Sequence, residues 1–131
     1  MDLTYEWRGA FTDAEVNRLH AEAFKHEPFD DGWMEQLQRW SLGWVVVREG
    51  SELVGFVNVP WDGYIHAFII DVIVAEGSRR AGVGTRLVEV ATEEARAAGC
   101  EWLHVDFEDE LASFYFDSCG FRPTKAGLIR L

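Results

Sequence analysis

Apolar residues recur with a helical period in two stretches near the start of the chain. Residues 11–24 carry them at i, i+3, i+7 and i+8, on one face of a helix: Val16, Leu19, Ala23 and Phe24. Thr12 stands three residues before Glu15, the capping-box spacing that satisfies free N–H groups at a helix start. A second, shorter helix is predicted over residues 33–40, with an apolar stripe at Trp33, Leu37 and Trp40.

Denser apolar runs, typical of strands, follow these helices. Residues 44–59 contain two β-rich runs around the turn Glu49-Gly50-Ser51, which predicts a hairpin. Residues 65–74 are nearly all apolar and rich in β-branched side chains, as in a strand that is covered on both faces. A further strand is predicted over residues 100–107.

The C-terminal half shows the helical period twice more. A long helix is predicted over residues 82–98, with Gly99 just past its end and an apolar face of Leu87, Val88, Ala91, Ala95 and Ala98. A last helix, ended by Gly120, has a face made of Leu111, Phe114, Tyr115, Ser118 and Cys119, and residues 126–131 are expected to add an edge strand. This order predicts an α/β (α+β) fold in one domain, residues 1–131, with a single mixed, largely antiparallel sheet between two layers of helices.

The composition is that of a globular protein with an acidic surface. Hydrophobic residues make up 48% of the chain, enough for a core, and no apolar run reaches the roughly 18 residues of a membrane span. The N-terminus lacks the pattern of a secretory signal, so Cys100 and Cys119 are expected to be reduced thiols in a cytoplasmic protein. The net charge of −11 argues against nucleic acid and anionic membranes as partners and favours a cationic one, such as an amine.

One short stretch departs from this acidic character. Residues 78–91, "SRRAGVGTRLVEVA", place Arg79 and Arg80 ahead of Gly82 and Gly84, where the long helix begins. Free N–H groups, the positive end of the helix dipole and bare backbone at a solvent-facing turn together describe a phosphate cradle. The same residues also fit a plain strand-to-helix turn with solvated arginines, and local spacing leaves both interpretations open.

Two motifs then resemble a known family. Arg79-x-x-Gly82-x-Gly84, between a buried strand and a long helix, resembles the acetyl-CoA signature of the GNAT superfamily of N-acetyltransferases. Residues 114–121, "FYFDSCGF", resemble the aromatic-Tyr…Gly-Phe segment that closes the family's catalytic domain. The resemblance covers residues 43–121. It implies that the strands at 65–74 and 101–107 are parallel but splay apart, with acetyl-CoA, and no metal, in the gap between them.

The resemblance also implies which positions hold acetyl-CoA. The backbone of the first strand would pair with the pantetheine arm, through Val72, Ile73 and Val74. The turn and helix start would hold the pyrophosphate, through Arg79, Arg80, Ala81, Gly82, Val83, Gly84 and Thr85. A backbone N–H near Val72 would stabilise the oxyanion that forms when an amine attacks the thioester.

Tyr115 occupies the family's general-acid position. A phenol with a pKa near 10 gives its proton to a thiolate near 8.5 only at a cost of about 2 kcal/mol. We therefore expect the Tyr115 hydroxyl to hydrogen-bond the leaving sulfur while water completes the proton transfer. The pattern by itself also fits an aromatic residue of the core.

Asp71 interrupts an apolar run, and a buried carboxylate needs a partner or a shifted pKa. It is expected either to orient the acceptor amine or accept its proton through water, or to be a structural carboxylate tied to a backbone N–H or an arginine; both roles remain open. His104 is interpreted as a core histidine. Candidates for the acceptor side of the gap are Trp33, Trp61, Tyr64, His66, Asp106 and Glu108, with core packing the alternative for Trp33 and an acidic loop the alternative for Glu108.

The chain departs from the family pattern at Ile70, where many members have an acidic residue, at Glu108, where many have Asn, and at Arg80, where glycine is common. These departures leave the general base unassigned. Two function classes follow: an acetyl-CoA-dependent N-acetyltransferase acting on a primary amine of a small molecule or peptide, or a non-catalytic acyl-CoA sensor or interaction module. A homodimer is compatible with either class.

Overall fold

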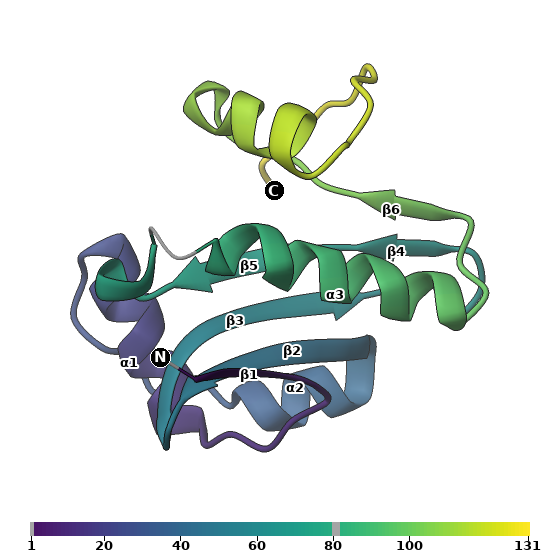
Figure 1. The fold of residues 1–131 in the computed structure, drawn as a ribbon. Coiled ribbons are helices and arrows are strands. Elements are labelled where there is room, and N and C mark those ends of the chain that lie inside the picture. The colour runs from purple at the N-terminus through teal and green to yellow at the C-terminus, as the bar shows by residue number, and fades with distance from the viewer. Residues whose placement is uncertain (1, 80–81) are drawn as a thin grey trace.

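The computed structural model describes residues 2–79 and 82–131. Figure 1 shows a curved sheet with helices on both sides and a C-terminal segment above it. The elements, in chain order, are β1 Leu3–Trp7, α1 Asp13–Phe24, α2 Trp33–Trp40, β2 Ser41–Glu49, β3 Glu52–Pro60, β4 His66–Phe68, β5 Ile70–Val74, α3 Val83–Ala97 and β6 Trp102–His104. None of the helices in these ranges has the length and apolar character that crossing a membrane requires.

The strands form two hydrogen-bonded groups. The first is antiparallel, in the order β1-β2-β3-β5, and the second is the parallel pair β4-β6. A bridge between Trp61 and Ala67 joins the pair to the end of β3, so the groups make up one mixed, largely antiparallel sheet. The predicted hairpin is confirmed, because β2 and β3 pair from Glu49 and Glu52 outward around Gly50, which has a φ of 61°.

The strand predicted over residues 65–74 is not continuous. The structure divides it at Ile69 into β4 and β5, and Asp71 has a φ of 57°, in the left-handed region that side chains other than glycine seldom adopt. The register between β3 and β5 shifts at the same level, between Phe56 and Asn58. This irregularity turns β5 away from the line of β4, as bulges do in many sheets.

The two predicted helical layers are confirmed. Helices α1 and α2 cover one face of the sheet, around Leu19, Leu37 and Phe56, while α3 covers the other through a set that includes Leu87 and Ala91. The capping box of α1 is present: Glu15 N–H donates to Thr12 Oγ1 at 3.2 Å, and Thr12 N–H donates to Glu15 Oε1 at 2.9 Å. Phe24 departs from the predicted face, since 53% of it is exposed.

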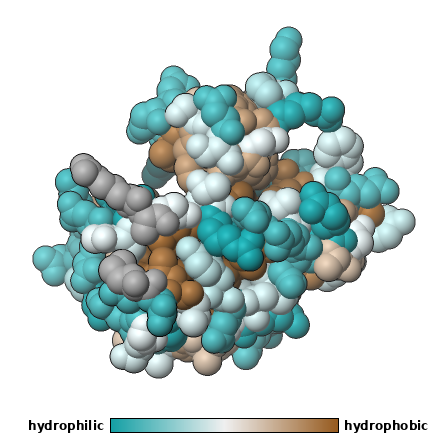
Figure 2. Space-filling view, in the orientation of Figure 1, coloured by the Kyte–Doolittle hydropathy of each residue, from teal (hydrophilic) through white to brown (hydrophobic). Residues whose placement is uncertain are grey.

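The C-terminal segment differs from the expected helix and strand. A 3₁₀ turn, Asp109–Leu111, leads into a π-helix, Ser113–Ser118, in which Cys119 N–H donates to the Phe114 carbonyl at 3.0 Å. The wider turn brings Tyr115 into the core and leaves Leu111 43% exposed. Residues 126–131 form no strand, and Leu128 and Ile129 are more than 80% exposed, at 81% and 86%. Figure 2 shows hydrophobic surface along the boundary between this segment and the rest of the domain.

Candidate active site

A gap opens where the two parallel strands separate. Strands β4 and β6 pair over three residues each, and Ile69 N–H then donates to the His104 carbonyl at 2.9 Å. Beyond that bond β5 pairs with β3, as one of the two outer strands of the antiparallel group in the described residues. The segment after His104 continues without strand pairing towards the C-terminal segment, which is why β6 is shorter than predicted (Figure 1). The sheet therefore offers one edge of β5 to a ligand in the gap.

The start of α3 lies at the end of this edge. Gly82 is the N-cap, has a φ of 72° and is exposed; no side chain in the described residues caps the helix, and its first turn contains no acidic residue. The first N–H groups and the positive end of the dipole thus remain available to an anion. Arg79 is exposed nearby, and its Nε–H donates to the Val74 carbonyl at 3.2 Å. Arg80 and Ala81 lie outside the described residues.

The other positions expected to hold acetyl-CoA expose little side chain. Val83 and Ile73 are buried, on opposite faces of the sheet, and Val72 and Val74 pack partly against the core below α3. Because these side chains pack inward, a ligand at this edge of the sheet would contact the backbone of the residues. Thr85 is half-buried in the first turn of the helix.

Gly84 has a second role that the sequence did not reveal. It is half-buried rather than solvent-facing, and a β-carbon there would lie 3.2 Å from Phe114 Cζ and 3.8 Å from Val74 Cγ2. The expectation that Arg79 and Gly84 both lie at a solvent-facing turn is therefore wrong for Gly84. Its missing side chain lets the start of α3 contact the C-terminal π-helix closely.

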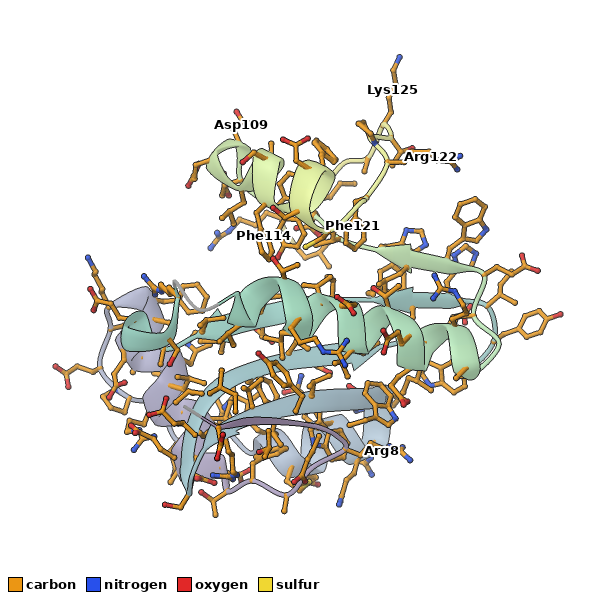
Figure 3. The ribbon with its side chains drawn as sticks, in the orientation of Figure 1. Arg8, Asp109, Phe114, Phe121, Arg122 and Lys125 are labelled. Carbon is orange, nitrogen blue, oxygen red and sulfur yellow. The ribbon has the colours of Figure 1, made fainter. Side chains whose placement is uncertain are left out.

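Tyr115 projects from that π-helix into the core, where 5% of it is exposed. Its ring stacks on Phe107, with centroids 4.7 Å apart, and meets Phe114 and Phe121 edge-on. Figure 3 shows Phe114 and Phe121 on the side of the C-terminal segment that faces α3, whereas Asp109 and Lys125 point away. The aromatic cluster fixes the direction of the Tyr115 ring.

Within the described residues, no side chain or backbone group hydrogen-bonds the Tyr115 hydroxyl, and the residue is 5% exposed. Burial, followed by the charges of Cys119 and Asp106, raises the pKa of Tyr115 to about 12. The hydroxyl thus stays protonated at neutral pH and can donate a hydrogen bond.

Asp71 is the second residue of β5, just after the break at Ile69 that separates β4 from β5. Its side chain is half-buried and accepts no hydrogen bond within the described ranges. Burial raises the pKa of the Asp71 carboxyl, and the charge of His20 on α1 lowers it by a smaller amount. The backbone is strained and the carboxylate is poorly solvated, a combination that is common at functional sites.

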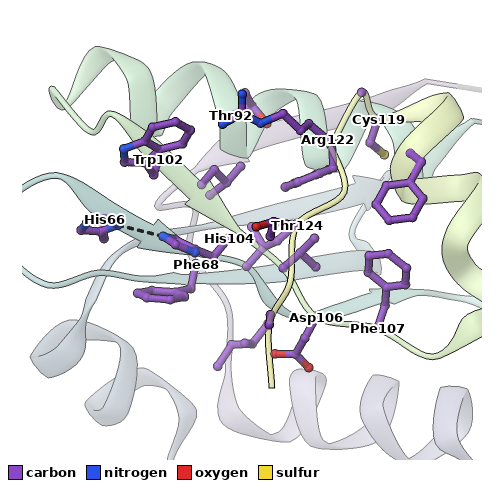
Figure 4. Close-up of a pocket in the computed structure, with 18 of the residues that line it drawn as sticks. His66, Phe68, Thr92, Trp102, His104, Asp106, Phe107, Cys119, Arg122 and Thr124 are labelled. Carbon is purple, nitrogen blue, oxygen red and sulfur yellow. Dashed lines mark hydrogen bonds between the residues drawn. The ribbon is translucent and has the colours of Figure 1, made fainter. Parts of the chain in front are cut away.

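The residues expected on the acceptor side separate into two groups. Trp33 lies in the core below α1, where its Nε1–H donates to Asn17 Oδ1 at 2.8 Å, so it packs rather than lines an open wall. Tyr64, 74% exposed, and Glu108 lie at the surface, and Trp61 bridges to β4. His66 and Asp106 line a cavity of about 1250 Å³ beside the gap, together with His104, Phe68 and Trp102 (Figure 4).

His104 is not a core histidine. It is exposed, and its Nε2 lies 2.8 Å from His66 Nδ1 across the two parallel strands. In the sequence, each of the two histidines lies within a predicted strand and is flanked by apolar residues. Only the register, which pairs His66 with Trp102 and Phe68 with His104, shows that the two imidazoles share a face.

Comparisons with known proteins agree with this geometry. The sequence model of the Acetyltransferase (GNAT) family matches residues 4–121. The chain therefore belongs to the GNAT family of acetyltransferases, and the resemblance seen in its motifs is confirmed. A comparison with curated protein sequences found no match.

Solved structures show the same fold at low sequence identity. An acetyltransferase from Trypanosoma brucei is 21% identical, with a TM-score of 0.83 and 99% of each chain covered. Glucosamine-6-phosphate N-acetyltransferase from Arabidopsis thaliana is 15% identical, with a TM-score of 0.76 and 98% of each chain covered. AAC(6')-Iy in complex with a CoA-containing bisubstrate analog is 14% identical, with a TM-score of 0.76 and coverage of 100% of this chain and 98% of that one.

Proposed function

We propose that this acetyltransferase moves an acetyl group from acetyl-CoA to a primary amine of a small molecule or peptide, by direct attack of the amine on the thioester. The observation that carries the proposal is the separation of the sheet after the bond between Ile69 and His104. It leaves an edge of β5 free on the side of the gap, with Asp71 at its start and the open end of α3 at its far end.

The residues present fit acetyl-CoA. The outer edge of β5, at Val72 to Val74, offers backbone groups to a pantetheine arm, apart from the Val74 carbonyl, which accepts from Arg79. The uncapped N–H groups of α3 with Arg79 suit phosphate. Bound there, acetyl-CoA would supply an acetyl group activated as a thioester. A structural relative that was solved with a CoA-containing analog supports this choice.

Three groups of the chain serve the chemistry. Asp71, half-buried near the start of β5, would attract and orient a cationic amine, as one of two open roles for this carboxylate. The N–H of Val72 would donate to the developing oxyanion. The Tyr115 hydroxyl would donate to the leaving sulfur without full transfer, because a phenol with a pKa of about 12 is a poor proton source for a thiolate.

A thiol-release assay tests the proposal. The chain is mixed with acetyl-CoA and a panel of amines that covers amino sugars, aminoglycosides, polyamines, amino acids and peptide N-termini. We expect thiol release that depends on one class of amine. Tight binding of acetyl-CoA in calorimetry without thiol release from any amine would instead favour the acyl-CoA sensor.

The charge of the chain bears on its partner. With a net charge of −11, the surface favours cationic acceptors over nucleic acid or anionic membranes. Structural relatives named as a glucosamine-6-phosphate N-acetyltransferase and an aminoglycoside acetyltransferase support a small-molecule acceptor. We propose the cytoplasm, where acetyl-CoA is made, as the place of action, and gel filtration with light scattering tests whether the chain forms a homodimer.

A further inference from the structure

The outer face of the β4–β6 ribbon carries a bonded pair of histidines (Figure 4). His66 Nδ1 and His104 Nε2 are 2.8 Å apart, so an N–H of one ring donates to the nitrogen of the other. The register places Phe68 and Trp102 on the same face, opposite the buried Ala67. Phe68 stacks on His104, with centroids 4.6 Å apart and an interplanar angle of 22°.

A neutral pair of this kind presents one donor and one acceptor to its surroundings. The two ring nitrogens outside the bond are His104 Nδ1 and His66 Nε2. When Nδ1 of His104 gains a proton, its Nε2–H can pass to Nδ1 of His66, and the Nε2–H of His66 can leave. One proton enters and one departs, and exchange with water then restores the tautomers.

The pair lies where such a path is useful. The carbonyl of His104 accepts the bond from Ile69, next to the opening of the gap, and the cavity that holds both imidazoles is also lined by Ile70 and Asp106. Val72 follows Ile69 by three residues in the chain. The lining of the cavity reaches Ile70, and the cavity has room for water molecules.

The surrounding charges favour outward movement through His66. An exposed carboxylate, Asp62, accepts the His66 backbone N–H at 3.1 Å, which places a negative charge beside His66. The charged side chains that line the cavity within the described residues are Asp106, Asp109 and Arg122. Arg122 lies over the Trp102 ring, 5.3 Å from its centroid, which places its charge on the ring rather than on the histidine pair.

We propose that His66 and His104 relay to solvent the proton that the acceptor ammonium must lose before its nitrogen attacks. The proposal rests on the proposed function above. The N–H bond of the ammonium breaks, its proton reaches His104 Nδ1 through water, and His66 releases a proton from Nε2; the electron pair stays on the amine nitrogen. Phe68 is a positioning residue that holds the His104 ring.

The experiment measures kcat/KM against pH for the parent chain, His66→Ala, His104→Ala and the double variant, with the best amine of the panel. Each single variant is expected to lose about 100-fold at pH 6, with the loss shrinking towards pH 9, where more of the amine is already neutral. The double variant should lose no more than either single one, because the relay is interrupted once. Added imidazole should restore the kcat/KM that the single variants lose.

The chain offers a matched control. Glu101→Ala is this control: its exposed side chain lies directly before β6 on the same ribbon and does not line this cavity, so the profile should be unchanged. Parent profiles in both single variants, or a loss that is equal at every pH and does not respond to imidazole, would overturn the relay alone. A parent chain that releases no thiol from any amine would overturn the proposed function and the relay together.

Discussion

A β-carbon at Gly84 would stand 3.2 Å from Cζ of Phe114, so the first turn of α3 meets the C-terminal π-helix through a missing side chain. Phe114 precedes Tyr115, whose ring lies in the same aromatic cluster. The contact therefore connects the proposed phosphate-binding turn to the hydroxyl proposed to meet the sulfur. Small changes at Gly84 should affect both the fold and the reaction.

Gly84→Val should lower the free energy of unfolding by about 1–3 kcal/mol, as overpacking does, and should lower kcat because Tyr115 is displaced with Phe114. Gly84→Ala should change stability less, since better helix propensity offsets part of the contact. Denaturant unfolding and thiol-release rates measure both effects. Gly77→Ala is the matched control, because a β-carbon there meets no atom within 4 Å. Equal behaviour of the Gly77 and Gly84 variants would contradict the contact.

Arg79→Glu should weaken acetyl-CoA binding about tenfold or more without changing the melting temperature, because the exposed guanidinium contributes charge beside the helix start. Calorimetry with acetyl-CoA measures the effect. Arg39→Glu is the matched control, because it changes the net charge by the same amount but lies on α2. Acetyl-pantetheine, which lacks the nucleotide phosphates, should bind both variants alike. Parent affinity for acetyl-CoA in Arg79→Glu would rule out this role.

Tyr115→Phe keeps the packed ring and removes the hydroxyl. We expect kcat to fall about tenfold, the worth of one hydrogen bond of roughly 1.4 kcal/mol made in the transition state, with little change in acetyl-CoA affinity. Because burial raises the pKa of Tyr115 to about 12, the parent should show no loss of rate from phenol ionisation below that pH. Tyr5→Phe serves as the control on β1. An unchanged kcat would make Tyr115 a core aromatic residue only.

Asp71→Asn separates the two roles left open for this carboxylate. Burial raises the pKa of Asp71, so its ionised form destabilises the folded state as pH rises above the unfolded value of about 3.9. Asn at this position, which also tolerates a φ of 57°, should therefore be as stable as Asp at neutral pH, or more so. For a functional carboxylate, KM for a cationic amine should rise and the pH–rate profile should move to higher pH.

Thermal melts and pH–rate profiles of Asp71→Asn measure these outcomes side by side. A lower melting temperature with kinetics intact would assign Asp71 a structural role. The result also bears on the histidine relay: if Asp71→Asn accounts for the whole acid limb of the profile, the proton leaves through Asp71 instead.

The local patterns determined much of the fold. The period of Val16 and Leu19, with the capping box at Thr12, predicted α1, and the turn at Gly50 predicted the hairpin. These features depend on contacts between residues close in sequence, so the amino-acid sequence by itself is enough to reveal them. The glycines and Arg79 marked the helix start proposed to bind phosphate for the same reason.

Tertiary structure decided the features that depend on partners distant in sequence. The bend at Asp71 follows from the shifted pairing with β3, and the inward turn of Tyr115 depends on a π-helix packed against Gly84. The pairing of His66 with His104, 38 positions later, depends on strand register. A one-residue change of register would put these imidazoles on opposite faces, and no local pattern in the sequence fixes that choice.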